Sequence, residues 1–132
     1  MKLLRRSKGF TLVEIMIVVA IIALLAAIAI PNLLRPKVAA NDALAKATIR
    51  SVSTASEAYA TANSGSYPPD IASLTTATPP YLNANYCGST ISGYAYTCTL
   101  AASGYTVAAV PTTVGTSGTT TYTISTGGVL SP

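Results

Sequence analysis

Histidine and tryptophan are absent from this 132-residue sequence, and only two residues are cysteine. Without histidine, the sequence lacks the most frequent general base of enzymes and a common metal ligand. Two thiols alone cannot complete a structural zinc site, which needs four ligands. A glycine-rich phosphate loop is also missing, as is any pair of carboxylates after residue 57. These absences favour a protein that is not an enzyme, and we expect neither a cofactor nor a metal site.

Charge is scarce, at 9% of residues, whereas about a quarter of residues are charged in a typical soluble domain. Four of the eight cations lie in residues 1–9, and the remaining four equal the four acids in number. The chain after residue 9 is therefore formally neutral. A basic leader on a neutral chain indicates membrane topology, because cations stay on the cytoplasmic side. Residues 58–132 contain no Lys or Arg, so we expect no nucleic-acid partner.

A long apolar segment follows the basic leader and covers residues 10–30, with Thr11 and Glu14 as its only polar side chains. As a helix, this segment would rise about 30 Å, which is the thickness of one bilayer core. We therefore predict a transmembrane or filament-core helix. Pro31 and Pro36 then predict an interruption near residues 31–36, because proline removes a helical hydrogen bond.

The helix is expected to continue to residue 62 as an amphipathic segment. A mildly apolar stripe recurs at spacings of three, four or seven residues, and most charges fall elsewhere. Asp42 lies four residues before Lys46, which is the favourable order for a helical ion pair. Gly65 is a plausible stop signal. The stripe consists of Leu34, Val38, Ala45, Ile49, Val52, Ser56 and Tyr59.

Residues 63–132 alternate between large and small side chains in a way that predicts a small antiparallel sheet. We expect strands at 94–100, 105–110 and 121–125, a turn at Gly127-Gly128, and a short last strand at 129–131. A single helical turn is expected at 71–74. Such a sheet needs the helix on one face to be stable. The predicted fold is α+β: a leader (1–9), a long helix (10–62) and a β-sheet head (63–132).

Two features of the head allow alternative interpretations. An even cysteine count behind an export segment favours a disulfide between Cys87 and Cys98, and the alternative is two unpaired buried thiols. Residues 112–126 contain ten Ser or Thr and no charge. They suit either an O-glycosylated contact surface or simply exposed strands of high β-propensity, and the second interpretation is favoured.

The segment from Lys8 to Leu34, which begins KGFTLVE, resembles the N-terminus of type IV pilins and type II secretion pseudopilins. The resemblance implies cleavage after Gly9 by a prepilin peptidase and N-methylation of Phe10. An ordinary secretory signal peptide, cut near residues 27–29, is the alternative. The acid inside the apolar region and the helix-forming sequence beyond it argue against that alternative.

Glu14 is the only acid in the apolar segment, where a carboxylate is costly unless it meets a partner. Cleavage after Gly9 creates such a partner, the amine of Phe10, four residues earlier. The family resemblance implies that this amine belongs to a neighbouring subunit. The alternative is that Glu14 lies at the membrane interface and is hydrated.

These observations predict a structural pilin of a type IV pilus, a homopolymer formed through the N-terminal helix. The expected partners are further copies, the prepilin peptidase/methylase and an inner-membrane assembly platform. The protein is expected in the bacterial inner membrane and then in an extracellular pilus, or a periplasmic pseudopilus. A type II secretion pseudopilin is the alternative, although common pseudopilins bind calcium through head carboxylates and this head has only Asp70. A DNA-uptake competence pilin is less favoured because the head lacks basic residues.

Overall fold

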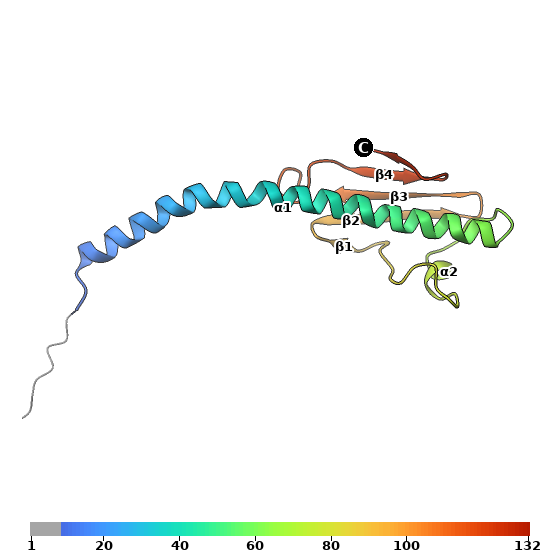
Figure 1. Cartoon of the computed structure of the whole chain (residues 1–132), viewed down its shortest axis with the longest axis horizontal. Helices are drawn as coiled ribbons and strands as arrows, with labels where there is room; N and C mark the ends of the chain where they lie inside the picture. Colours follow the sequence, from blue (N-terminus) through green and yellow to red (C-terminus); the bar gives the residue numbers. More distant parts are fainter. Residues whose placement is uncertain (1–8) are drawn as a thin grey trace, which may run out of the picture. The chain divides into compact units, whose positions relative to one another are not determined.

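The computed structural model of the chain describes residues 9–132, which form two compact units divided after Arg35 (Figure 1). The predicted leader, except for Gly9, lies outside the described residues. The units are described separately below. One helix, α1 (Leu12–Ala62), contributes its first half to one unit and its second half to the other.

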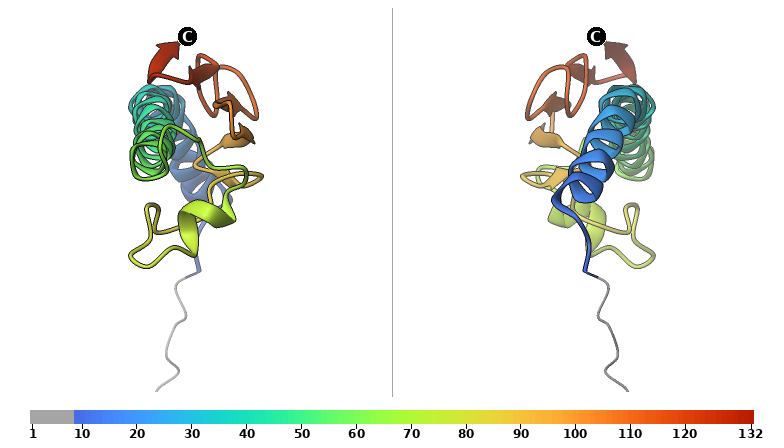
Figure 2. Two further views of the ribbon diagram at one scale, coloured as in Figure 1. Left: turned by 90° about the vertical axis from the view of Figure 1, so that its right-hand side faces the viewer. Right: turned by 90° about the vertical axis from the view of Figure 1, so that its left-hand side faces the viewer.

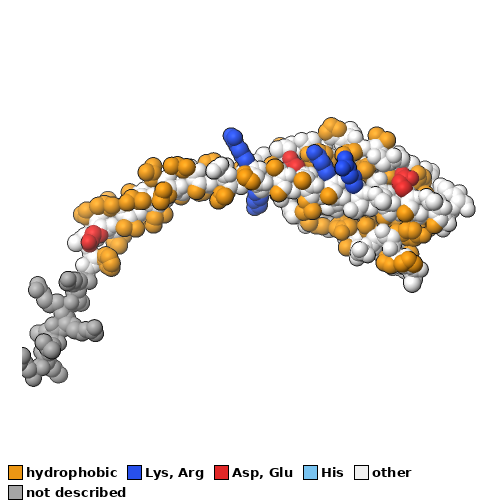
Figure 3. Space-filling view, in the orientation of Figure 1, with side chains coloured by type: hydrophobic (Ala, Val, Ile, Leu, Met, Phe, Trp, Pro, Cys, Tyr) orange, Lys and Arg blue, Asp and Glu red, His pale blue; other side chains and the backbone are white. Residues whose placement is uncertain are grey.

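In the first unit, α1 leaves its apolar side chains uncovered by the rest of the chain (Figure 3). Large side chains along this segment, such as Ile15, Ile22 and Leu33, are more than half exposed. An 18-residue window of α1 has a mean hydropathy of 3.0, so the helix is long and apolar enough to cross a membrane. A signal sequence near the N-terminus has the same length and hydropathy, so these two properties alone do not show that the helix crosses a membrane.

The predicted interruption near residues 31–36 is wrong, because α1 is assigned as helix through both Pro31 and Pro36. Each proline removes one N–H donor, but its fixed φ of about −65° is compatible with a helix. The alanine- and leucine-rich residues on either side are strong helix formers and continue the hydrogen-bonded turns.

The second unit places residues 36–62 of α1 across one face of a five-stranded antiparallel sheet (Figure 2). The strands follow one another in sequence order, β1-β2-β3-β4-β5. This order needs only hairpin connections, since antiparallel neighbours can be joined by tight turns. The strands are β1 (Thr90–Ile91), β2 (Tyr94–Ala101), β3 (Gly104–Pro111), β4 (Tyr122–Ser125) and β5 (Val129–Ser131).

The core lies between α1 and the inner face of the sheet. Most residues of the predicted apolar stripe of α1 are buried in this core, whereas Leu34 and Tyr59 are only partly covered. The buried stripe residues are Val38, Ala45, Ile49, Val52 and Ser56. Opposite them, β2, β3 and β4 contribute alternate side chains, as the period of two predicts. The buried strand residues are Tyr94, Tyr96, Tyr105, Val107, Ala109, Tyr122 and Ile124.

The connections agree with most of the predicted turns. The short helix α2 (Ala72–Thr75) forms one residue later than expected, and the β4–β5 turn contains Gly127 and Gly128 with φ of 83° and 73°. Glycine adopts such positive φ values without steric cost. The edge strand β1 was not predicted, because two residues are too few to show an alternating pattern.

Candidate functional site

The N-terminal end of α1 is a capping box formed by Thr11 and Glu14. The Thr11 amide and hydroxyl donate to Glu14 Oε2 at 2.7 and 2.8 Å, and the Glu14 amide donates to Thr11 Oγ1 at 3.2 Å. These bonds satisfy donors that have no partner within the first helical turn. The cap thereby fixes the start of α1 at Leu12.

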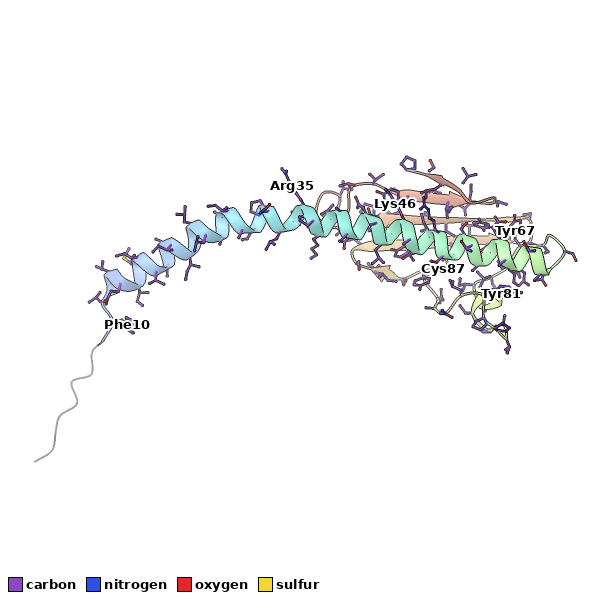
Figure 4. All side chains as sticks on the ribbon, viewed as in Figure 1. Phe10, Arg35, Lys46, Tyr67, Tyr81 and Cys87 are labelled. Atoms are coloured by element: carbon purple, nitrogen blue, oxygen red, sulfur yellow. A yellow bond between two sulfur atoms is a disulfide. The ribbon has the colours of Figure 1, made fainter. Side chains whose placement is uncertain are left out.

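Gly9 and Phe10 lie outside the helix, in backbone without regular structure, and both are exposed (Figure 4). Phe10 is 82% exposed, and among the described residues beyond Phe10 no heavy atom lies within 4 Å of where a Cβ on Gly9 would be. The Gly9–Phe10 peptide bond is therefore open to another protein. In this chain the Phe10 nitrogen belongs to that bond, so its pairing with Glu14 after cleavage remains a prediction.

The capping role of Thr11 is a structural feature that was not predicted from the sequence. Its signal was present, because Thr11 and Glu14 form the S/T-x-x-E pattern that marks a helix start. Two of the three cap bonds involve the Glu14 carboxylate, and both end on the same oxygen, Oε2. Within residues 9–132, the other oxygen accepts no hydrogen bond, so it can accept a further donor while the cap stays intact.

Asp42 attaches the beginning of the second unit's helix to the loop before β4. It accepts a 2.6 Å hydrogen bond from the Tyr94 hydroxyl, a 3.0 Å bond from the Thr119 amide, and a bond from the Thr119 hydroxyl. Partial burial raises the pKa of Asp42, but these donors and the nearby Lys46 charge outweigh it, so the pKa lies below its ordinary value. We call this group the Asp42 clasp.

Glu57, which lies later in α1, makes a similar attachment between the helix and the rest of the head. Its Oε1 accepts bonds from the Tyr105 hydroxyl at 2.9 Å and the Gly127 amide at 2.8 Å, and its Oε2 accepts one from the Tyr67 hydroxyl at 3.0 Å. Burial alone raises the pKa of Glu57, but the three hydrogen-bond donors together lower it by more, so the pKa lies below its ordinary value. The Tyr105 hydroxyl also lies 2.6 Å from Ser53 Oγ. This group is the Glu57 clasp.

The Asp42 clasp corrects the predicted pairing of Asp42 with Lys46. The structure shows no ion pair between them, and Lys46 Nζ instead lies 4.7 Å from the centre of the Tyr122 ring, a cation–π contact. The spacing of the apolar stripe in α1 already indicates that Asp42 lies on the helix face that meets the sheet. Asp42 lies between Val38 and Ala45 at steps of four and three, so its side chain points toward the sheet.

The predicted disulfide between Cys87 and Cys98 is confirmed, with a Cα–Cα distance of 5.4 Å (Figure 4). It joins the loop before β1 to the middle of β2. The bridge thus holds an edge of the head that has little regular structure. No group of three or more metal-ligating side chains gathers within the part of the chain that the structure describes.

The comparisons with known proteins concern the N-terminal part of the chain. Residues 4–30 match the family described as the prokaryotic N-terminal methylation motif. This match includes the apolar segment of α1, so that segment is part of a methylation motif, which an ordinary signal peptide lacks. The motif covers the exposed Gly9–Phe10 bond, the capping box and the uncovered first part of α1.

Three curated proteins show the same similarity at the level of individual relatives. The chain is 48% identical over 56 residues to the type IV wide pilus major component PilA4 of Thermus thermophilus, covering 42% of this chain and 43% of the relative. It is 46% identical over 54 residues to the type IV major pilin protein PilA of Myxococcus xanthus, covering 41% and 24%. It is 41% identical over 64 residues to the type II secretion system core protein G of Vibrio cholerae, covering 48% and 44%.

The matched segments span less than half of each of these relatives. Comparison with solved structures gave no significant match.

Proposed function

We propose that the protein is the structural subunit of a type IV pilus, cleaved after Gly9 and polymerised through α1. The observation that carries this proposal is the uncovered apolar half of α1, most of which lies within the methylation motif. Burial of one large apolar side chain contributes about 1.5–3 kcal/mol, so a helix with many such side chains favours lipid or other copies over water. Two successive environments, a bilayer and then a filament core, meet this requirement.

Cleavage after Gly9 supplies the second element of the proposed assembly. The new Phe10 amine is a cation, and the open Oε1 of Glu14 in another copy is an acceptor. In an apolar surrounding each charge is costly alone, and their pairing offsets that cost. The pairing therefore favours the growth of a polymer and sets the axial register between copies.

The proposed partners are further copies of the chain, a prepilin peptidase that cleaves and methylates, and an assembly platform in the inner membrane. The subunit resides in that membrane before assembly and outside the cell afterwards. The one structural requirement for the peptidase is an accessible scissile bond, and the exposure of Gly9 and Phe10 meets it.

The deciding experiment separates the charge of Glu14 from its role in the helix cap. Glu14→Gln removes the charge but keeps an acceptor for the Thr11 amide. Thr11→Val removes the side-chain half of the cap but keeps the charge. Each variant is expressed in a strain that lacks the native gene, and processed subunit in the membrane is compared with sheared surface filaments.

We expect normal cleavage and few filaments from Glu14→Gln, and near-normal filaments from Thr11→Val. Mass spectrometry of the parent filaments should give a chain that begins at methylated Phe10. Full assembly of Glu14→Gln, or an equal defect in Thr11→Val, would refute the pairing. A mature chain beginning near residue 30 would refute the pilin function itself.

A pseudopilin of a type II secretion system is the second candidate, favoured by the similarity to protein G of Vibrio cholerae. The only acid of the head, Asp70, accepts two 2.8 Å bonds from Ser73 at Oδ1, and a calcium site needs several carboxylate or carbonyl oxygens. Long surface filaments in the deletion strain complemented with this gene would support a pilus. A secretion defect without surface filaments would support a pseudopilus.

A further inference from the structure

The outer face of the sheet, opposite α1, carries uncharged side chains no larger than valine, including the exposed Val110 and Val129. The strand register aligns them in two rows of four, Thr97–Ala108–Thr123–Ser131 and Thr99–Thr106–Ser125–Val129, and one row of three, Thr90–Ala95–Val110. Every tyrosine of β2, β3 and β4 lies on the inner face and is buried. The outer face therefore has no bulky side chain that would interrupt close approach by another flat surface.

This outer face is also free of charge and open to hydrogen bonding. All four cations of residues 9–132 belong to α1, and Lys46 is on the helix side of the sheet. Thr97, Thr99 and Thr106 are exposed, and their hydroxyls make no hydrogen bond to the described residues 9–132. A threonine hydroxyl is both a donor and an acceptor, so two such faces are complementary to each other.

We propose that this outer face is a contact between copies in neighbouring filaments, which bundles the filaments side by side. The inference rests on the filament proposed above. Within the second unit, residues 36–62 of α1 cover the inner face of the sheet, so the outer face is the one open to another copy. Contact between copies of the same patch is the common symmetric arrangement, and aligned sheet faces pack about 10 Å apart.

The size of the face explains why bundling needs a filament. Two strands of eight residues and three shorter ones give a face of about 400 Å², from strand rise and spacing. Two copies bury about 800 Å², which is below the range of stable complexes. Repetition along a filament makes each further contact intramolecular, so many weak contacts add up to a stable bundle.

A neutral polysaccharide is the competing ligand for a flat, uncharged face. The outer face offers no aromatic ring that could stack on a sugar ring, because the tyrosines of β2, β3 and β4 lie on the inner side. A second copy therefore fits this face better than a sugar surface does.

The test adds one lysine to the outer face. Thr106→Lys and, separately, Thr97→Lys place charges opposite each other in the contact, whereas Ala84→Lys adds the same charge in an exposed loop between α2 and β1. Purified filaments of each variant are examined by negative-stain electron microscopy and low-speed pelleting. The measurements are made at 10 mM salt and at 1 M salt, where the screening length falls from about 30 to about 3 Å.

We expect the parent and Ala84→Lys filaments to bundle at both salt concentrations. Thr106→Lys and Thr97→Lys filaments should form in normal yield, remain single at 10 mM salt with several-fold less pelleting, and bundle again at 1 M salt. Unchanged bundling of both outer-face variants, or equal dispersion of Ala84→Lys, would overturn the proposal. So would single parent filaments, or bundles that require an added polysaccharide. Absence of filaments in the parent would overturn the proposed function as well.

Discussion

Three tyrosines on the inner face of the sheet allow the clasps to be measured by removal of a single oxygen. Tyr94 donates to Asp42, Tyr105 contacts Glu57 and Ser53, and the Tyr96 hydroxyl is buried without any partner in the described chain. All three rings are at most 3% exposed. Substitution by phenylalanine keeps each ring in place, so the differences report on the hydroxyl groups.

The three substitutions are expected to change the free energy of unfolding in different directions. A hydrogen bond to a charged acceptor contributes about 1.5–3 kcal/mol, so Tyr94→Phe and Tyr105→Phe should lower the free energy of unfolding by about this amount. A buried hydroxyl without a partner costs about 1–3 kcal/mol, so Tyr96→Phe should be neutral or stabilising. The Tyr94 proton serves either Asp42 or the Thr120 carbonyl at 2.9 Å, which places that variant toward the lower end.

The assay is thermal unfolding of the full chain in detergent, with the disulfide intact. For a unit of 60–100 residues, 1 kcal/mol shifts Tm by about 4–8 °C. Tyr94→Phe and Tyr105→Phe should therefore melt about 10 °C below the parent, and Tyr96→Phe at or above it. Equal losses in all three variants would show that ring packing, and not the clasps, determines stability at these positions.

Two further predictions concern pH and the disulfide. Because the folded pKa values of Asp42 and Glu57 lie below their unfolded values, their contribution to stability is complete above about pH 5 and is lost as the pH falls through the folded pKa values. Tm should fall on acidification, and less steeply in Tyr94→Phe; a pH-independent Tm would contradict this. The Cys87→Ser/Cys98→Ser double variant should lose about 3 kcal/mol, the loop-closure value for this spacing, in denaturant unfolding, and an unchanged midpoint would refute it.

Local patterns account for what the sequence predicted correctly. The apolar run, the helix and the strand alternation each depend on neighbouring residues, so they could be predicted without a structure, whereas cleavage at Gly9–Phe10 and the pairing of Glu14 remain predictions. The Gly127-Gly128 turn could also be predicted, because positive φ is a local requirement. The Cys87–Cys98 disulfide could be predicted from the export segment and the short spacing between the two cysteines.

The clasps could not be predicted because their partners are distant in sequence. Asp42 and Thr119 are 77 residues apart, and Glu57 and Gly127 are 70 apart. From sequence alone, the nearest cation was the only visible partner for Asp42, which produced the wrong pairing with Lys46. The helix continues through Pro31 for a different reason: the helix-forming residues on either side outweigh the local cost of one lost hydrogen bond.

The two clasps also dictate an order of events as the chain emerges from synthesis with its N-terminus first. Asp42 and Glu57 emerge early, whereas Thr119 and Gly127 emerge about 70 residues later. Until then, both carboxylates and the tyrosines that meet them lack part of their final surroundings. The head therefore completes its fold only after nearly all of its strands have been synthesised. In the proposed pilin, membrane anchoring by α1 would precede this step, and the late C-terminal strands would close a head whose N-terminal helix has already been made.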